Sequence, residues 1–498
     1  MKKINLLLVS ILFIAACGSG EQDVPINELP VEETVNEKLE KIIAVNQLTG
    51  DPSSGRDIPN IDSPLAKLGK KLFFSKSLGG DTDAACASCH HPLLGGGDAL
   101  SLSVGTGAEI PDLIGPGRKH SSVAPGFDGG PTVPRNSPTT FNIALWDESL
   151  FWDGRVESLG KTSGTNGNDG TGITTPDVPF GTVDVNAGDD LVQAQAGFPI
   201  TSPEEMKGFE FAVEQDNDTV RAHLAARLGD FGVGEGELIN NLWLKEFQTA
   251  YNSLQDAEQL ITIERITQAI SAYERSQLFI NNSWKAYLEG DTRALSEPAK
   301  RGALLFYTNI EEGGAGCSEC HSGDKFTDEQ FHNLCTIQIG RGKGNGETGD
   351  DDFGRFNITG EQQDKYAFRT PSLLNVEVTG PWGHSGAYTT LESIVRHHLN
   401  PRESLDNFDY AALEPGIQTD NAIANTNNAL AQLESMSTQE GVVNTQADLS
   451  DDQVNDIIEF LKTLTDPCTN DEACLAPWLP DESTDDLDST LLRSMVRL

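Results

Sequence analysis

Basic residues and long apolar runs are both scarce in this chain. Its 498 residues include 35 Lys and Arg against 76 Asp and Glu, a formal net charge of −41. This acid excess argues against nucleic-acid binding, because a phosphate backbone would be repelled. It suits a basic protein partner or, equally, a surface that merely keeps the protein soluble. With 37% apolar residues and 49 glycines, the chain is globular and long enough for more than one domain.

The one continuous apolar run covers residues 4–16 and follows two lysines. It is too short to span a bilayer, and its layout is that of a secretory signal. The run leads into Ile-Ala-Ala-Cys at 14–17, which resembles a bacterial lipobox; a plain signal peptide is the alternative. We therefore expect 1–17 to be a lipoprotein signal ending in the lipidated Cys17, with the folded protein in the periplasm. Gly18 after the cysteine favours the inner leaflet of the outer membrane.

Cysteine is also scarce, with eight residues in a compartment where disulfides are the default. Four of them form two Cys-x-x-Cys-His motifs, the c-type haem attachment pattern. Two thiols at this spacing add to the vinyl groups of one haem, and the adjacent histidine faces the iron. A zinc site is the alternative, but it leaves both histidines unexplained. We assign one haem to Cys86, Cys89 and His90, and a second to Cys317, Cys320 and His321.

The two motifs lie in an internal duplication. A helix-like stretch with an aromatic end precedes each motif, at 66–73 and at 299–306. Helical apolar spacing recurs at 237–254, 263–279 and 451–464, with Asp451 as the expected cap of the last helix. Long strands with alternating polarity are missing. The sequence therefore predicts an all-α fold with two class I cytochrome c-like haem domains and long loops.

Composition shifts suggest where these domains begin and end. The segment that follows the lipobox is polar and acidic apart from a short helical patch, which is typical of a tether. The last thirty or so residues are acidic and punctuated by proline. The predicted division is a tether at 18–58, an N-terminal haem domain at 59–290, a C-terminal haem domain at 291–466 and an acidic tail at 467–498.

The remaining cysteines have simpler predictions. Cys468 and Cys474 are close enough in the sequence to close a small disulfide loop. Cys335 is left over and is expected to be a buried or free thiol.

Several short motifs occur in a fixed order between residues 59 and 465. They are Leu-Phe-Phe at 72–74, Val-Pro-Arg-Asn-Ser-Pro-Thr at 133–139, Phe-Trp-Asp-Gly-Arg at 151–155, Pro-Glu-Glu-Met at 203–206, Phe-Arg-Thr-Pro-Ser-Leu at 368–373 and Pro-Trp-Gly-His-Ser-Gly at 381–386. Together with the two haem motifs, this series resembles the bacterial di-haem cytochrome c peroxidases and their relatives of the MauG type.

The resemblance implies different roles for the two haems. Peroxide would react at the N-terminal haem, with His90 as its proximal ligand, and electrons would enter at the C-terminal haem, with His321. Trp152 resembles the tryptophan that relays electrons between them; a core tryptophan is the alternative. A calcium ion between the domains is also implied, because a hard cation prefers oxygen ligands. Its expected ligands are the Asn136 side chain and the backbone oxygens of Thr379 and Pro381.

Cleavage of a peroxide O–O bond needs a base to take a proton and an acid to return it. Glu205 resembles the family's distal carboxylate, and Gln195, ten residues earlier, resembles its hydrogen-bonding neighbour. A glutamate near an apolar haem face has a raised pKa and can hold the shuttled proton. A solvated surface glutamate is the alternative, which we expect of Glu204 instead.

One departure from the peroxidases concerns the N-terminal haem. In those enzymes a histidine after a Ser-Val-Gly-like turn blocks the reactive iron, whereas residues 103–106 here read Ser-Val-Gly-Thr. The next candidate is His120, which either reaches the iron or, as we favour, lies at the surface or beside the site. Without a blocking ligand, the N-terminal haem would be five-coordinate, as in the MauG branch.

A second departure concerns the sixth ligand of the C-terminal haem. Where the peroxidases carry methionine and MauG carries tyrosine, this chain has Arg-His-His at 396–398. We expect His398 to be the ligand; His397 points about 100° away on a helix, so only one of the pair can face the iron. The alternatives are histidines that merely complement a helix C-terminus, and Met436 as the ligand.

These observations predict a di-haem peroxidase that reduces hydrogen peroxide with electrons from a small donor, a cytochrome c or a cupredoxin. Two alternatives stay open. One is MauG-like oxidation of a protein or organic substrate, favoured by the missing histidine. The other is a di-haem electron carrier without chemistry, against which Gln195 and Glu205 argue. We expect no nucleic-acid partner and membrane contact only through the lipid anchor, and we also consider a homodimer.

Overall fold

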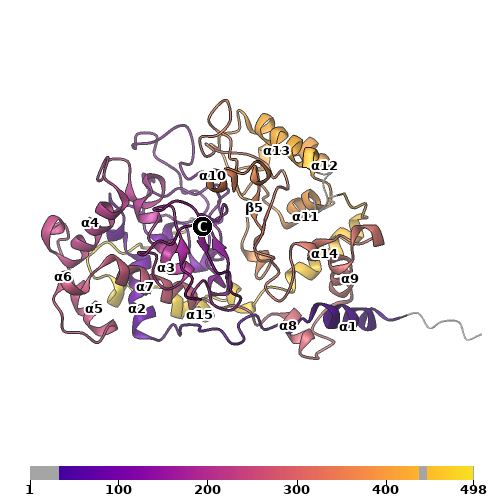
Figure 1. Ribbon diagram of the computed structural model, residues 1–498, viewed down its shortest axis with the longest axis horizontal. Coiled ribbons are helices and arrows are strands. Elements are labelled where there is room, and N and C mark those ends of the chain that lie inside the picture. The colour runs from indigo at the N-terminus through magenta and orange to yellow at the C-terminus, as the bar shows by residue number, and fades with distance from the viewer. Residues whose placement is uncertain (1–32, 437–445, 497–498) are drawn as a thin grey trace, which may run out of the picture. The chain divides into compact units, whose positions relative to one another are not determined.

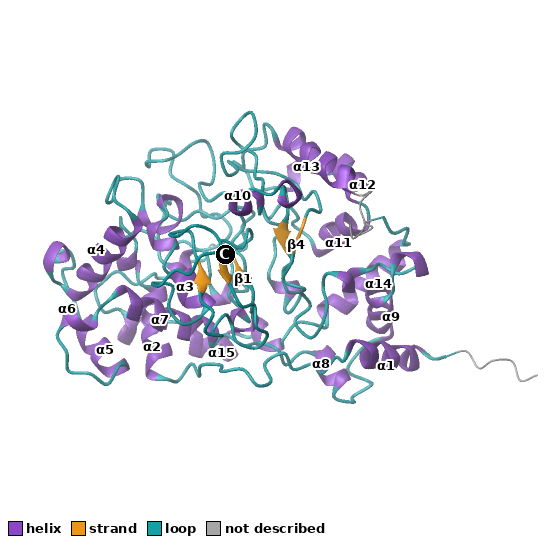
Figure 2. Ribbon diagram, viewed as in Figure 1, coloured by secondary structure: helices purple, strands orange, loops and turns teal. Residues whose placement is uncertain are grey.

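The computed structural model describes residues 33–436 and 446–496, and the predicted lipoprotein signal at 1–17 lies outside them (Figure 1). Among the regular elements of the described residues, helices predominate, as predicted, and strands are few and short; long loops connect them (Figure 2). No helix among these residues is long and apolar enough to cross a membrane. The strands form two small antiparallel sheets: β1 (Ser149–Leu150), β2 (Val156–Ser158) and β3 (Ile173–Thr174), and β4 (Phe331–His332) with β5 (Phe368–Arg369).

A first hydrophobic core is built around the crossing of α2 (Pro64–Phe74) and α7 (Ile263–Arg275). Ser63 caps α2 and proline occupies its first turn, two features that favour a helix start at this point. A Cβ atom on Gly69 would lie only 1.8 Å from the Ala269 carbonyl oxygen, so glycine is what permits this close crossing. The other helices on this side are α3 (Leu191–Ala196), α4 (Asn217–Gly229), α5 (Trp243–Ala250) and α6 (Ala257–Leu260).

A second core repeats this arrangement around α9 (Glu297–Tyr307) and α14 (Asp451–Lys462). A Cβ atom on Gly302 would again lie 1.8 Å from a carbonyl oxygen, that of Asp456. The cap of α14 is Ser450 rather than the expected Asp451, because the Ser450 hydroxyl accepts a hydrogen bond from the first turn. The two glycine crossings are the structural form of the duplication seen in the sequence.

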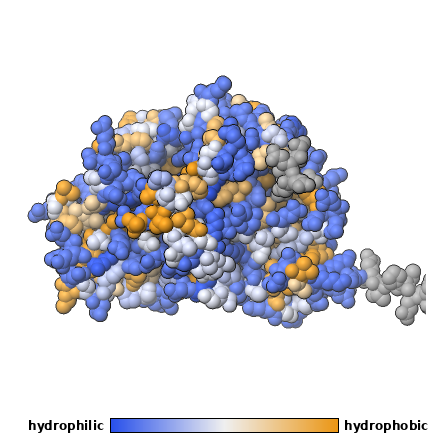
Figure 3. Space-filling model, in the orientation of Figure 1, coloured by the Kyte–Doolittle hydropathy of each residue, from blue (hydrophilic) through white to orange (hydrophobic). Residues whose placement is uncertain are grey.

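The remaining helices take no part in either of the two central helix crossings. Figure 1 shows α4 to α7 gathered on one side, and α9, α11 and α14 on the other. Figure 3 shows that the visible face is mostly hydrophilic, as the acid-rich composition predicts. The helices not yet named are α1 (Val35–Asn46), α8 (Ser283–Leu288), α10 (Phe356–Thr359), α11 (Leu391–Leu399), α12 (Pro401–Asp406), α13 (Ala422–Met436), α15 (Glu472–Leu475) and α16 (Glu482–Asp485).

The second half of the predicted tether at 18–58 is part of the folded body, which corrects that expectation. Leu39 on α1 is fully buried in the second core, and Leu48 after the helix is buried there too. Arg56 then forms a buried ion pair with Asp147, 2.6 Å between Nη2 and Oδ2. The acidic composition predicted a tether, but a few apolar residues on one helix face are enough to pack the segment against the folded body.

The acidic tail at 467–498 is also folded, up to residue 496, where the description ends. Leu491 and Leu492 are buried in the first core, and Asp488 accepts a hydrogen bond of 2.6 Å from the indole nitrogen of Trp243. The predicted disulfide between Cys468 and Cys474 is present. Cys335 is a free, buried thiol, as expected.

Candidate active site

One cavity brings together the residues that the sequence analysis singled out. Segments from both halves of the chain form its walls, which contain both Cys-x-x-Cys-His motifs. The predicted site residues on these walls are Cys86, Cys89, His90, Trp152, Gln195, Glu205, Cys317, Cys320, His321 and His398, with the three expected calcium ligands Asn136, Thr379 and Pro381.

The first motif presents a neutral imidazole to the cavity. Cys86 begins a short 3₁₀ turn, and burial raises the pKa of the Cys89 thiol to about 12. The Gly96 carbonyl oxygen lies 3.3 Å from Nδ1 of His90, and the Ser137 hydroxyl lies 3.2 Å from Nε2. Because a carbonyl only accepts, Nδ1 carries the ring proton and Nε2 keeps its lone pair. Burial lowers the pKa of His90, so the ring is uncharged and suited to bind iron.

The second motif faces a partner imidazole across the cavity. His321 Nδ1 donates to the Phe326 carbonyl oxygen at 3.1 Å, and His398 Nδ1 donates to the Ile394 carbonyl oxygen at 2.8 Å. Both Nε2 atoms are therefore left as metal ligands. Burial lowers the pKa of both rings, to about 4 for His321, which keeps them uncharged.

The separation of these two rings fits a single iron between them. Their centres lie 6.2 Å apart. An imidazole nitrogen binds a transition metal at about 2.0 Å, and roughly 1.1 Å more reaches the ring centre, which gives about 6.2 Å across one metal. The neighbouring His397 points elsewhere: its Nε2 lies 2.8 Å from the Leu334 carbonyl oxygen, in a fully buried position. Met436, the competing ligand, ends α13, where its sulfur accepts a hydrogen bond from Gln432.

Glu205 lies in a π-helical turn, η6 (Pro203–Lys207), which directs it and Glu204 differently. Burial raises the pKa of the Glu205 carboxyl, and Arg155 opposes the shift with its Nη2 atom 3.8 Å from Oε1. Glu204 instead accepts a hydrogen bond of 3.1 Å from the Ser202 hydroxyl. Gln195, on α3, lines the same cavity as Glu205. The carboxyl at the cavity is thus the protonatable one, as the acid/base role requires.

The turn at 103–106 packs directly against η6. The Thr106 hydroxyl donates to the Pro203 carbonyl oxygen at 2.8 Å, and the Thr106 backbone nitrogen donates to the Glu204 carbonyl oxygen at 3.3 Å. The buried Arg118 holds the same turn by donating to the carbonyl oxygens of residues 104 and 105. His120 is also buried, but its ring stacks on Phe127, with the ring centres 5.6 Å apart, away from the walls of the cavity.

A buried ion cluster holds Trp152 between the two halves of the chain. Arg135 pairs with Asp153, next to Trp152, and with Asp352 from the C-terminal half, each at 2.6 Å. The Trp152 indole nitrogen donates to the Asn136 carbonyl oxygen at 2.9 Å. This tryptophan is therefore fixed on the wall of the cavity by contacts that a residue of a simple apolar core does not need.

The three expected calcium ligands line the same cavity and carry oxygen atoms of the type that binds a hard cation. The Asn136 amide nitrogen donates to the carbonyl oxygens of Leu100 and Ser101, at 3.0 and 3.4 Å, which turns its amide oxygen the other way. Thr379 and Pro381 lie on the same cavity wall. Amide and backbone carbonyl oxygens are what Ca²⁺ prefers.

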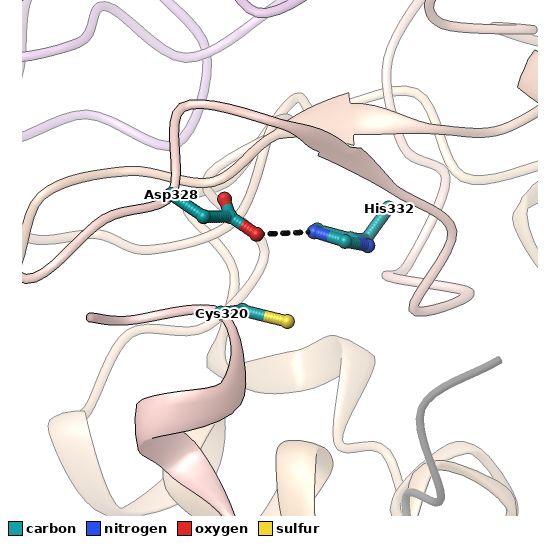
Figure 4. Close-up of side chains that lie close together, drawn as sticks. All are labelled: Cys320, Asp328 and His332. Atoms are coloured by element: carbon teal, nitrogen blue, oxygen red, sulfur yellow. Dashed lines mark hydrogen bonds and ion pairs between the residues drawn. The ribbon is translucent and has the colours of Figure 1, made fainter. Parts of the chain in front are cut away.

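The sequence analysis missed a polar cluster beside the second motif, made of Cys320, Asp328 and His332 (Figure 4). His332 Nε2 lies 2.8 Å from Asp328 Oδ2, and this hydrogen bond, together with the Cys320 thiol, raises the pKa of His332 to about 10. The three ligand atoms lie within 4.8 Å of one another. Because Cys320 belongs to a Cys-x-x-Cys-His motif, its sulfur would bind haem in a c-type cytochrome and would not be available to a separate metal. No sequence spacing signals this cluster.

Known proteins resemble this chain over most of its length. The sequence model described as di-haem cytochrome c peroxidase matches residues 63–293. The methylamine utilization protein MauG of Methylorubrum extorquens is 28% identical over 336 residues, which cover 68% of this chain and 69% of that protein. The cytochrome c551 peroxidase of Pseudomonas aeruginosa is 26% identical over 351 residues, which cover 70% and 74%.

Solved structures share the fold. A MauG-like protein associated with microbial copper homeostasis has a TM-score of 0.53 at 21% identity and covers 84% of this chain and 96% of its own. The di-haem peroxidase BthA of Burkholderia thailandensis has a TM-score of 0.50 at 20% identity, covering 84% and 89%. This chain is an oxidoreductase that is similar to the di-haem cytochrome c peroxidases and to MauG, and that likeness implies two covalently bound haems.

Proposed function

We propose that the protein reduces hydrogen peroxide to water, with a small cytochrome c or a cupredoxin as the electron donor. The balanced reaction is H₂O₂ + 2 H⁺ + 2 e⁻ → 2 H₂O. The observation that carries the proposal is the Glu205 carboxyl, held with a raised pKa on the cavity wall that also contains His90. The names of the peroxidase relatives support the same reaction.

The two motifs and three histidines would hold the haems, in two cytochrome c-like domains built on the two cores. When bound, the haems supply the site of peroxide binding and the path for electrons. Cys86 and Cys89 would attach the first haem, with His90 as ligand, and the second motif would attach the other between His321 and His398. Trp152, fixed on the cavity wall, is placed to relay electrons between them.

The protein's own part in the reaction is to move a proton. Glu205 takes the proton from the near oxygen of the bound peroxide and delivers it to the far oxygen as the O–O bond breaks. Burial makes the carboxyl basic enough to accept that proton, and Arg155 stabilises the ionised form. Gln195 is placed to orient the peroxide by hydrogen bonding. A calcium ion on Asn136, Thr379 and Pro381 would brace the same wall.

Location and attachment belong to the proposal as well. The lipobox-like sequence that ends at Cys17 supports a lipid-anchored protein in the periplasm, on the inner leaflet of the outer membrane. An oxidising compartment also suits the disulfide between Cys468 and Cys474.

MauG-like oxidation of a protein or organic substrate is the second candidate. It is favoured by the turn at 103–106, which packs on η6 with a threonine in place of a blocking histidine. It also agrees with the likeness to MauG.

One experiment separates these functions. Peroxide is added to the purified di-haem protein with and without reduced cytochrome c, and both the donor and the protein spectra are followed. Rapid, catalytic donor oxidation supports the peroxidase. A long-lived spectral change with little donor turnover supports the MauG-like oxidase instead. Absence of any spectral change with peroxide overturns both functions.

Haem attachment gives a prediction of its own. Intact mass should show two covalent haems and metal analysis no stoichiometric zinc, because both motifs place paired thiols and a histidine on one cavity. Replacing both Cys86 and Cys89 by alanine should remove one haem, and replacing Cys317 and Cys320 the other. Cys335→Ala, at the buried free thiol, should keep both. Stoichiometric zinc in place of haem would contradict the assignment.

A further inference from the structure

The two helix crossings put α7 and α14 in the same register. Ala269 stands at the first crossing and Asp456 at the second, each against a glycine. Four residues further on, each helix carries an aromatic ring that packs on the helix before its haem motif. The ring centres of Tyr273 on α7 and Phe73 on α2 lie 4.9 Å apart. The ring centres of Phe460 on α14 and Phe306 on α9 lie 5.2 Å apart. The register of the two repeats therefore extends to the wall of the cavity.

The residue after this aromatic ring is ionisable in one helix and apolar in the other. It is Glu274 in the first repeat and Leu461 in the second. Both line the cavity, and they are only 4% and 5% exposed. At equivalent positions, the N-terminal haem site therefore has a carboxyl group where the C-terminal site has a hydrocarbon side chain.

The Glu274 carboxyl has no partner to balance a charge. Its Oε2 atom is buried and makes no hydrogen bond within the described residues. The adjacent Arg275 pairs instead with Asp190, 2.9 Å between Nη1 and Oδ2, and Ser271 also donates to Asp190. Ionising Glu274 would therefore place an uncompensated charge in the interior. Burial, with a smaller contribution from Asp190, raises the pKa of Glu274 to about 8, so the carboxyl is protonated at neutral pH.

We propose that Glu274 is a second acid of the N-terminal haem site, and that at mildly alkaline pH it takes up a proton when this haem is reduced. Reduction adds one electron to the haem and makes its charge more negative, which favours protonation of the nearby carboxylate. Solvent supplies that proton and an O–H bond forms on Glu274. Oxidation returns the electron to an acceptor and the proton to solvent.

The surroundings leave few other groups that could mimic this behaviour. Glu274 lies close enough to Cys86 to act electrostatically on its sulfur, so it would lie near the haem that Cys86 attaches. The nearby Asp190 is already paired with Arg275, and burial keeps Tyr273 protonated with a pKa well above its usual value. Two other carboxyls beside the first motif have raised pKa values, Glu205 and the buried Asp98, whose pKa is raised to about 7, so the test must separate the three.

The test is the reduction potential of the N-terminal haem as a function of pH, measured by spectroelectrochemical titration. The wild-type potential should be flat at neutral pH, where Glu274 is protonated in both redox states. It should fall as pH rises through mildly alkaline values, because an ionised Glu274 stabilises the oxidised haem. The limit for one proton per electron is a tenfold change in the reduction equilibrium constant per pH unit, which is 59 mV. Glu274→Gln should abolish most of this slope, and so should Glu274→Leu, which copies position 461.

Four controls make the result decisive. Glu264→Gln, at an exposed position on the same helix, should keep the wild-type slope. The slope should also survive in Glu205→Gln and in Asp98→Asn, the two other carboxyls with raised pKa values near this motif, and the C-terminal haem potential should not respond to Glu274→Leu. A slope that is unchanged in both Glu274 variants overturns the inference, as does a slope lost only in Glu205→Gln or only in Asp98→Asn. The inference rests on the proposed haem at His90 but not on peroxidase activity; absence of that haem would overturn the proposed function instead.

Discussion

Glu205→Gln should lower peroxide turnover by about 100-fold or more while both haem spectra stay unchanged, the usual scale for a positioned acid/base group. The amide keeps the size and polarity of the carboxyl but cannot carry the proton between the two peroxide oxygens. Steady-state donor oxidation and stopped-flow mixing with peroxide measure the effect. The loss should appear in the step that consumes peroxide, because binding of the donor does not involve this side chain.

The pH dependence adds a second signature. Burial raises the pKa of Glu205, and the base must be ionised to accept the peroxide proton. Turnover should therefore fall as pH drops through that raised pKa, and this acid limb should be missing in Glu205→Gln.

Glu204→Gln is the matched control, one residue away on the same turn. Its carboxyl accepts a hydrogen bond from Ser202 and is absent from the cavity walls, so its loss should leave turnover nearly unchanged. Equal losses in the two variants would mean that the acid/base group lies elsewhere.

His398→Gly should abolish the bis-histidine low-spin EPR signal of the oxidised protein. The ring of His398 lies 6.2 Å from that of His321, the separation that suits two axial ligands of one iron. Removing it would take away the proposed sixth ligand of the C-terminal haem. Imidazole in place of thioether stabilises ferric iron, so the wild-type haem should have a lower potential than the methionine-ligated haems of related peroxidases.

His397→Gly provides the control, because that ring is directed to the Leu334 carbonyl oxygen and not to the cavity. The variant should lose stability at this buried position and yet keep the bis-histidine signal. Added imidazole should restore the signal in His398→Gly, which distinguishes a lost ligand from a damaged fold. A methionine-to-iron charge-transfer band in the wild-type near-infrared spectrum would move the ligand to Met436 and contradict the assignment.

Features encoded by neighbouring residues could be predicted from the sequence alone. The helices that begin near residues 64 and 297 follow from local apolar spacing, a serine cap and an early proline. The haem motifs need only five consecutive residues, and the disulfide near residue 470 joins cysteines six positions apart. The duplication is likewise visible as two short similar stretches, although their glycines acquire a reason only from the helix crossings.

Where two adjacent residues of the same type were candidates for one role, only the tertiary structure showed which of them faces the cavity. Helical geometry shows that His397 and His398 diverge, but only the packing of α11 decides which one faces the cavity. A π-helical turn, which no local pattern announced, separates Glu205 from Glu204 in the same way.

By itself, the sequence determined the helical class, the two haem motifs, the duplication and the order of the motifs between them, because each depends on residues close together in the chain. Only the tertiary structure decided that the segment around α1 and the acidic tail are folded, since a few buried leucines outweigh a charged composition. It also decided that Glu274 and Leu461 occupy matching positions. Burial and unmet hydrogen bonds arise from residues far apart in the sequence, and these physical conditions turn an ordinary glutamate into a proton-holding group.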